Sequence, residues 1–325
     1  MSSKISLKTK IKFPKVVLYL LKLGDGRICC SSFNDIYILN KNTFTPEIIE
    51  KNAHKKVINS LSQLEDGKLV SCANERFLNI YNIEEKSLSI HQKIDVLSVI
   101  PVDLTKKFKY LFKATELSNK ELAICGLFPV IIFFEYNSLK ELYDFKYYII
   151  NEDYDTIKNF KQINENQIIL ATYRTYNAFG NMGFLTRIKL CDLEKKEIRE
   201  KPIITNSGKF VGESMCKISE NYLAIGVHQS ILIIDLKKLK KVKKYDINDN
   251  FRNLCVFNNY LVCGSDRGII YKYIINEETN GDKLELKEKI KIDDDMYILS
   301  LIKLNKKTIA FTESYTLFII NIKNS

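Results

Sequence analysis

Short apolar runs separated by polar turn residues follow one another along the whole chain. The stretch LSQLEDGKLVSCANERFLNIYN, residues 61–82, has three such runs, with Asp66-Gly67 between the first two. Gly, Asn and Asp accept the positive φ angles of tight hairpin turns. The stretch therefore predicts three antiparallel strands. No helical spacing of apolar residues is sustained over three turns anywhere in the chain, so helical architectures are not favoured.

The second run of this stretch recurs seven times, as an aliphatic residue followed by small or branched residues. The copies start at Ile28, Leu69, Leu122, Ile169, Leu223, Leu261 and Ile309, which places them 38 to 54 residues apart. Each copy is preceded by an apolar run and a turn, and is followed by a third apolar run and a charge-rich fourth segment. This repeat indicates an all-β fold, a seven-bladed β-propeller of four-stranded antiparallel blades.

The two ends of the chain complement each other. The last unit ends at LFIINIKNS without a fourth strand, whereas a β-like segment at residues 4–13 precedes the first unit. Because an unpaired sheet edge invites aggregation, we expect the N-terminal strand to complete the last blade and close the ring. We expect a single domain, 1–325, with blades at roughly 14–54, 55–94, 95–150, 151–205, 206–248, 249–291 and 292–325 plus 4–13.

Several third runs end in Asn or Asp, and Ala53-His54 precedes the second unit. The residues concerned are Asn40, Asn82, Asp192, Asp235 and Asn321. In these features the chain resembles the WD-repeat β-propeller family over nearly its whole length. That family has Trp-Asp at the end of the third strand, where this chain has Asn or Asp, and Gly-His where this chain has Ala53-His54. The chain has no Trp, and one His stands at the family position. We therefore expect the family's Asp-His-Ser-Trp hydrogen-bond network to be absent.

The eight cysteines lie mostly within the apolar runs, and no CxxC pair occurs. This arrangement predicts buried free thiols in a reducing compartment, either the cytoplasm or the nucleus. The N-terminal segment lacks the apolar core of a signal peptide. The longest uncharged apolar run, residues 122–134, is too short to span a bilayer, so no transmembrane segment is expected.

The formal charge of +11 has two interpretations. Scattered lysines favour a compositional origin, whereas an acidic partner, nucleic acid or an acidic membrane surface is the alternative. One basic cluster is expected on the outer strand of blade 5: Lys237, Lys238, Lys240, Lys241, Lys243 and Lys244. Lysines on an edge strand prevent edge-to-edge pairing, and we favour this explanation over binding of an anionic ligand.

No catalytic constellation is present in the sequence. His54, His91 and His228 lie in different units without metal-ligand spacing and are expected to be solvated or turn histidines, and no GxSxG occurs. Carboxylates gather at 152–155 and 293–295, and Asn248-Asp249-Asn250 falls at the equivalent place; turn chemistry is a simpler explanation for these segments than a cation site. We expect no enzyme activity, no cofactor and no metal.

A long loop between the second and third strands of blade 4, residues 173–184, is the strongest candidate for function. It carries Arg, Tyr, Phe and Met, which are common in interface hot spots. With neighbouring loops it defines the candidate partner-binding residues Arg174, Tyr176, Phe179, Met182, Phe210, Arg76, Arg252 and Arg267. The alternative is that the aromatic residues fold back as a local lid.

These observations predict a non-catalytic scaffold or adaptor that presents loops on one face to a protein or peptide partner, which the basic charge suggests is acidic. Two alternatives stay open. One is a propeller that binds phosphoinositide or nucleic acid through a basic rim, and the other is a structural subunit of a larger complex.

Overall fold

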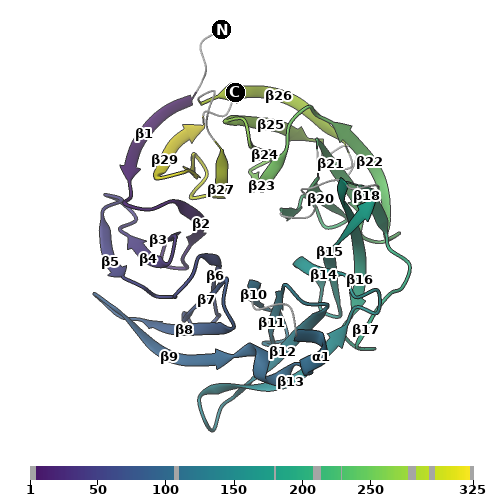
Figure 1. Cartoon of the computed structure of the whole chain (residues 1–325). Coiled ribbons are helices and arrows are strands. Elements are labelled where there is room, and N and C mark those ends of the chain that lie inside the picture. The colour runs from purple at the N-terminus through teal and green to yellow at the C-terminus, as the bar shows by residue number, and fades with distance from the viewer. Residues whose placement is uncertain are drawn as a thin grey trace. The chain divides into compact units, whose positions relative to one another are not determined.

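The computed structural model describes residues 5–105, 110–178, 181–207, 214–227, 229–276, 283–292 and 297–322. Within these residues the chain forms seven antiparallel sheets, which we number blades 1 to 7 in chain order from β2. Two short helical segments, η1 (Val96–Val99) and α1 (Val102–Thr105), lie in the connection between blades 2 and 3. The blades can be followed in Figure 1 by their labels and colours.

The chain has two compact units. The middle unit comprises Leu23–Arg174 and Arg187–Pro202, and the terminal unit comprises Met1–Lys22, Thr175–Thr186 and Ile203–Ser325.

The middle unit contains blades 2 and 3, with strand orders β6-β7-β8-β9 and β10-β11-β12-β13. Its strands are β3 (Ile28–Ser32), β4 (Asp35–Leu39), β5 (Pro46–Glu50), β6 (Ile58–Gln63), β7 (Leu69–Ala73), β8 (Phe77–Ile83), β9 (Leu88–Asp95), β10 (Leu111–Glu116), β11 (Leu122–Gly126), β12 (Val130–Asn137), β13 (Leu142–Ile150), β14 (Thr156–Asn164) and β17 (Glu197–Ile198).

The terminal unit contains blades 5, 6 and 7, with strand orders β19-β20-β21-β22, β23-β24-β25-β26 and β1-β29-β28-β27. Its strands are β1 (Ile5–Lys12), β2 (Val17–Lys22), β18 (Ile204–Ser207), β19 (Met215–Lys217), β20 (Tyr222–Val227), β21 (Ser230–Asp235), β22 (Lys240–Asp246), β23 (Phe251–Phe257), β24 (Tyr260–Ser265), β25 (Ile269–Ile275), β26 (Leu284–Lys291), β27 (Ile298–Lys303), β28 (Thr308–Glu313) and β29 (Thr316–Ile322).

Blades 1 and 4 have the strand orders β2-β3-β4-β5 and β14-β15-β16-β17, and β18 also pairs with β16. The strands β15 (Gln167–Ala178) and β16 (Asn181–Asp192) are the longest in the described residues. Every predicted copy of the second strand is the second strand of its blade, so the sequence repeat is confirmed as the repeat of the structure.

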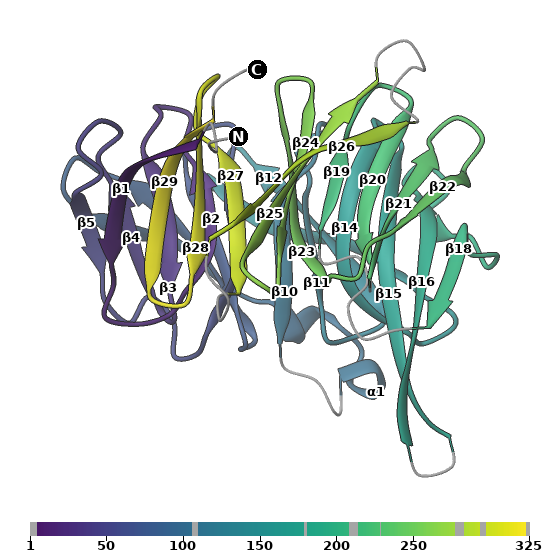
Figure 2. The same cartoon turned by 90° about the horizontal axis from the view of Figure 1, so that it is seen from above.

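The N-terminal strand completes the last blade, as the sequence predicts. β1 pairs antiparallel with β29, from Ile5 opposite Ile322 to Lys12 opposite Thr316, and Figure 2 shows the two strands side by side. After β1, Phe13 N donates to Tyr315 O at 2.8 Å and Val17 N donates to Ser314 O at 2.6 Å. The two ends of the chain are thus joined in one sheet.

Small residues in the repeat mark the places where successive blades approach closely. A Cβ atom added to Gly264 of blade 6 would overlap the Ile298 side chain of blade 7. One added to Gly226 of blade 5 would lie 3.0 Å from the carbonyl oxygen of Phe251 in blade 6. Buried apolar side chains fill the remaining space between these blades, which explains why the repeat requires small residues at this position.

The Asn or Asp at the end of the third strand organises the turn that follows. Asn40 Oδ1 accepts hydrogen bonds from the backbone N–H groups of Asn42 and Thr43, at 2.8 and 3.0 Å. Asp235 Oδ1 does the same for Lys237 and Lys238, at 2.9 and 2.8 Å. Asn and Asp favour turns by this local bond to the backbone. The recurring residue therefore has a structural role at these positions.

Side chains also bond the first strands of successive blades to one another. In the middle unit, Asn59 Nδ2 donates to Leu111 O at 2.6 Å. In the terminal unit, the equivalent bond runs from Asn253 Nδ2 to Leu299 O at 2.5 Å. The two acceptor residues, Leu111 and Leu299, each lie at a register shift of their own strand, where the sheet ladder is interrupted.

Blade 2 contains a hydrogen-bond network of the kind that the sequence led us to expect to be absent. His54 is 2% exposed, and its Nδ1 and Nε2 atoms lie 2.5 Å from Glu75 Oε1 and 2.7 Å from Ser71 Oγ. Tyr81 stands where the resemblance places Trp, and its hydroxyl donates to Ala53 O at 3.0 Å. The expectation of a solvated or turn histidine at His54 was therefore wrong, because Glu and Tyr replace the family's Asp and Trp.

The cysteines follow the prediction of free thiols. All eight are free; six are buried, whereas Cys216 and Cys255 are half-buried. Burial raises the pKa of the Cys125 thiol to about 12, so it stays protonated at neutral pH.

Candidate functional site

The connections after the second and the fourth strand leave from the same end of a four-stranded antiparallel blade. We call this end of the middle unit the loop face. Among the residues of its connections that the structure describes, three aromatic side chains are exposed: Phe33 at 43%, Tyr110 at 43% and Tyr154 at 69%. Phe33 and Tyr154 both have a positive φ, 58° and 55°, which is unusual for a bulky residue. Their exposed position is therefore fixed by the surrounding structure.

Tyr154 lies between two aspartates of a charged cluster. Asp153 and Asp155 flank it in the connection between β13 and β14, and Arg174 of β15 reaches both of them. Arg174 Nε donates to Asp155 Oδ1 at 2.6 Å, and its Nη2 donates to the Asp153 carbonyl. The Asp155 side chain is fully buried, whereas that of Arg174 is 46% exposed.

The rest of the cluster comes from β16. Arg187 donates to the second oxygen of Asp155, and Lys189 Nζ lies 2.5 Å from Asp153 Oδ2 and 3.0 Å from Asn151 Oδ1. The hydrogen bond from Lys189 holds the pKa of Asp153 below its ordinary value. Two carboxylates are thus matched by three cations, and Arg174 is the most exposed of the three.

Two other predicted arginines lie in connections after the second strand. Arg76 of blade 2 makes a two-point ion pair with Asp95, with Nε 2.7 Å from Oδ1, and its side chain is 45% exposed. In the terminal unit, Arg267 Nε lies 3.7 Å from Asp249 Oδ1. Burial raises the pKa of Asp249, whose Oδ2 accepts a hydrogen bond from Tyr271. Each arginine is thus oriented by an aspartate.

The remaining predicted residues have different outcomes. Residues 173–184 do not form a long loop: β15 continues to Ala178 and β16 starts at Asn181, so Tyr176 and Met182 belong to strands. Arg252 belongs to β23 and is half-buried, so its prediction as a loop residue was wrong. Phe179, Phe210, His228 and the carboxylates 293–295 lie outside the described residues.

The predicted basic cluster lies at the fourth strand of blade 5. Lys240, Lys241, Lys243 and Lys244 belong to β22 and are exposed. Lys237 and Lys238 are exposed in the turn before it. Lys244 Nζ forms an ion pair with Asp246 at 2.6 Å.

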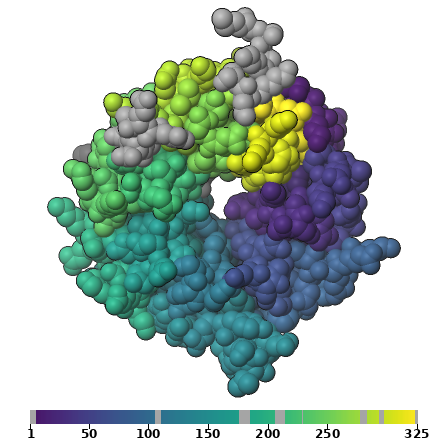
Figure 3. Space-filling view, turned by 180° about the vertical axis from the view of Figure 1, so that it is seen from behind, coloured from purple at the N-terminus to yellow at the C-terminus, as the bar shows by residue number. Residues whose placement is uncertain are grey.

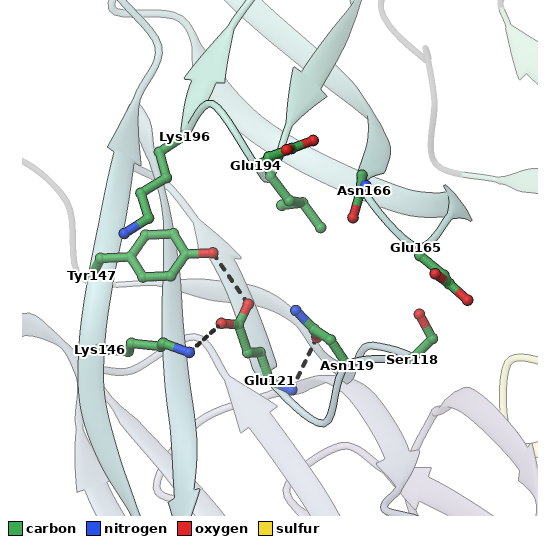
Figure 4. Close-up of a pocket in the computed structure, with 10 residues that line it drawn as sticks. Ser118, Asn119, Glu121, Lys146, Tyr147, Glu165, Asn166, Glu194 and Lys196 are labelled. Atoms are coloured by element: carbon green, nitrogen blue, oxygen red, sulfur yellow. Dashed lines mark hydrogen bonds and ion pairs between the residues drawn. The ribbon is translucent and has the colours of Figure 1, made fainter.

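A pocket of about 540 Å³ lies between blades 3 and 4 at the opposite end of the middle unit from the loop face. Figure 4 shows Lys146 and Tyr147 beside the carboxylate of Glu121, with Lys146 Nζ 2.8 Å from Oε1 and the Tyr147 hydroxyl 3.1 Å from Oε2. Burial, followed by the Glu121 charge, raises the pKa of Tyr147. Lys196 Nζ lies 4.5 Å from the centre of the Tyr147 ring. The buried carboxylate of Glu121 already bonds Lys146 and Tyr147, so these contacts indicate a structural role in blade 3 and not a catalytic one.

Among the described residues, no group of three or more His, Cys, Asp and Glu side chains is arranged to hold a metal ion. In the same part of the chain, no helix has the length and apolar character needed to cross a membrane.

The sequence matches no protein-family model, and no curated protein is significantly similar to it. Its structure, in contrast, is similar to 1201 chains of solved structures. One is a chain in the "Crystal Structure of Mitotic Checkpoint Complex", with a TM-score of 0.72 and 11% sequence identity over 98% of this chain and 92% of that chain.

At 11% identity this similarity shows the fold. The chain is an all-β, seven-bladed β-propeller with four-stranded antiparallel blades and an N-terminal strand that completes the last blade.

Tyr154 and Phe33 were missed by the sequence reasoning. Tyr154 was grouped with its acidic neighbours, although an aromatic residue inside a polar connection was a signal that could have identified it. No comparable signal marked Phe33, because it follows an apolar strand and resembles its continuation.

Proposed function

We propose that the chain is a non-catalytic scaffold of the WD-repeat family that binds a protein or peptide on the loop face of the middle unit. The supporting observation is the pair of Tyr154 and Arg174, which are both exposed: Arg174 bonds the buried Asp155, and Tyr154 precedes Asp155 in the chain. Tyr and Arg are enriched at interface hot spots. The bond to Asp155 reduces the conformational entropy that Arg174 would lose on binding a partner.

The proposed surface includes Arg76 and Phe33 in addition to this pair. Its exposed arginines favour a partner with acidic side chains. Tyr176, Phe179, Met182, Phe210, Arg252 and Arg267 stay predictions from the sequence as further contact residues. The similar solved chain comes from the structure of a protein complex, which is consistent with a role in an assembly. The cytoplasm or the nucleus is the proposed location.

Replacement of Tyr154 by Asn tests the proposal without disturbing the fold. Asn tolerates a positive φ, so Tyr154→Asn removes the ring while the backbone conformation at 55° stays accessible. The measurement is quantitative affinity purification of tagged protein from cells. We expect specific partners to bind about tenfold more weakly or worse, the effect of losing a hot spot.

Leu139→Asn is the matched control. Leu139 is 96% exposed and lies in the β12–β13 turn, at the end of blade 3 opposite the loop face. It should retain the partners that Tyr154→Asn loses, and Arg174→Gln should lose the same ones. If folded Tyr154→Asn retains every partner of the wild type, the loop face is not the binding surface.

A further inference from the structure

The fourth strands of the blades differ in charge between the two units. In the terminal unit, β1, β22 and β26 carry ten lysines and three acidic residues: Lys8, Lys10, Lys12, Lys240, Lys241, Lys243, Lys244, Lys287, Lys289 and Lys291, against Asp246, Glu285 and Glu288. In the middle unit, β5, β9, β13 and β17 carry two lysines and five acidic residues: Lys93 and Lys146, against Glu47, Glu50, Asp95, Asp144 and Glu197.

Protection of sheet edges does not explain this difference. Every fourth strand is an edge strand, so each needs protection from pairing with another chain. The edges of the middle unit have this protection with few lysines. A lysine content that was simply high throughout the chain would have placed lysines on the fourth strands of both units. The lysines of the terminal unit therefore form a distinct surface, which we call the basic edge.

Each strand of the basic edge also exposes an aliphatic side chain among its lysines: Leu7 at 59%, Val242 at 39% and Leu286 at 42%. The fourth strands of the middle unit expose Ile49, Ile90 and Ile150, so the combination with lysines distinguishes the basic edge. Figure 1 shows β1, β22 and β26 along the periphery of their blades, and Figure 3 shows the green and yellow-green residues of blades 5 and 6 at the surface.

We propose that the basic edge binds the surface of an anionic lipid bilayer. Lysines beside exposed aliphatic residues suit such a surface, because the ammonium groups meet acidic headgroups while the aliphatic groups enter the boundary of the acyl chains. All ten lysines are exposed, so their charges lie where headgroups can reach them.

The same observations disfavour nucleic acid as the occupant. Proteins that bind single strands combine basic residues with aromatic side chains on which bases stack. The three strands of the basic edge contain one aromatic residue, Tyr245, and it is half-buried beneath Lys243, whose Nζ lies 5.4 Å from the centre of its ring. The exposed aliphatic residues would have no role on a polyanion.

Vesicle co-sedimentation tests the proposal. The probes are vesicles of phosphatidylcholine alone and vesicles with about a third phosphatidylserine, at rising salt. We expect binding to the anionic vesicles alone, weakened by salt. Replacement of Lys240, Lys241, Lys243 and Lys244 by Ser should reduce this binding tenfold or more.

The matched control changes four exposed lysines of the middle unit, Lys55, Lys56, Lys86 and Lys201, to Ser. Both variants lose the same net charge, but the control should bind vesicles like the wild type. The double change Val242→Ser and Leu286→Ser should weaken vesicle binding severalfold and leave binding to a single-stranded oligonucleotide unchanged.

Three results would overturn the proposal: no binding to anionic vesicles, equal loss in the two lysine variants, or tighter binding to the oligonucleotide than to vesicles. The test is independent of the proposed scaffold function, because Tyr154→Asn changes the loop face and should leave vesicle binding intact.

Discussion

At the scale of single residues, the two ring nitrogens of the buried His54 bond Glu75 and Ser71 within blade 2. His54 was recognised at the family position, yet the absence of Trp suggested that no network could form around it. The structure shows that a buried carboxylate–imidazole–hydroxyl arrangement needs no indole, since Glu75 and Ser71 bond the two ring nitrogens and Tyr81 bonds the carbonyl of Ala53. A side chain's partners depend on neighbours that are distant in sequence, and a residue-by-residue comparison with a motif cannot supply them.

Loss of the His54 ring should destabilise blade 2. In His54→Ala, Ser71 and Glu75 would lose their partner in a buried site, which costs about 2–3 kcal/mol of unfolding free energy. Urea unfolding measures this loss. His91→Ala is the control, because its ring bonds a single exposed carbonyl, that of Glu141, and it should cost roughly 0.5 kcal/mol. Equal losses in the two variants would show that the network contributes nothing specific.

The same histidine should make stability depend on pH. Burial lowers the pKa of His54 from its ordinary value of 6.5. Below pH 6.5 the unfolded chain therefore takes up a proton that the folded chain does not, so the stabilisation is complete above 6.5 and decreases as the pH falls toward the folded pKa. Unfolding free energies at about pH 7.5 and about pH 5.5 should differ more for the wild type than for His54→Gln, which cannot titrate. If the wild type and His54→Gln showed the same difference between the two pH values, groups other than His54 would be responsible for the pH dependence.

At the scale of elements, strands were predictable and their ends were not. The seven second strands were found because buried strands repeat an apolar pattern with a small residue at a fixed place, and the N-terminal strand was found because the last unit lacks a fourth strand. The stretch around residues 173–184 was taken for a loop because it is polar and contains Gly180 and Gly183. In the structure β15 continues to Ala178 and β16 starts at Asn181, although no apolar alternation in the sequence marks these parts of the strands.

The small residue of the repeat leads to a prediction about blade contact. Gly264→Ala should destabilise the terminal unit by about 1–3 kcal/mol, because the added Cβ would overlap Ile298 of the next blade. Gly226→Ala should cost less, since its Cβ would need a shift of only a few tenths of an ångström from Phe251. Urea unfolding measures both changes.

A double-mutant cycle checks the cause of the Gly264→Ala effect. Ile298→Ala removes the overlapping side-chain atoms, so Gly264→Ala should cost less in that background than in the wild type. Additive costs would show that the loss at Gly264 comes from the backbone and not from contact with blade 7.

At the scale of the whole molecule, periodicity supplied what local patterns could not. Seven units and a missing fourth strand predicted both the fold and the pairing of the two ends, and β1 does pair with β29. The candidate site was less predictable, because the charged cluster around Asp155 joins three separate segments of blade 4. The charge difference between the fourth strands likewise became visible only once the strands were assigned to units.

The pairing of the two ends predicts what removal of the N-terminal strand would do. Deletion of residues 1–12 would leave β29 as an open edge and expose part of the core of blade 7, including Phe318 and Ile320. At about 1 kcal/mol per lost backbone hydrogen bond, we expect a loss of roughly 3–5 kcal/mol and concentration-dependent aggregation, since open edges recruit other chains. Deletion of residues 1–4, which precede β1, should change neither property.

A peptide of residues 4–13 added to the truncated chain should restore stability by pairing with β29, whereas a scrambled peptide should not. Thermal unfolding and light scattering measure the outcome. A truncated chain that unfolds like the full-length protein and stays monomeric would show that the β1–β29 pairing is dispensable, and that the last blade is stable with three strands.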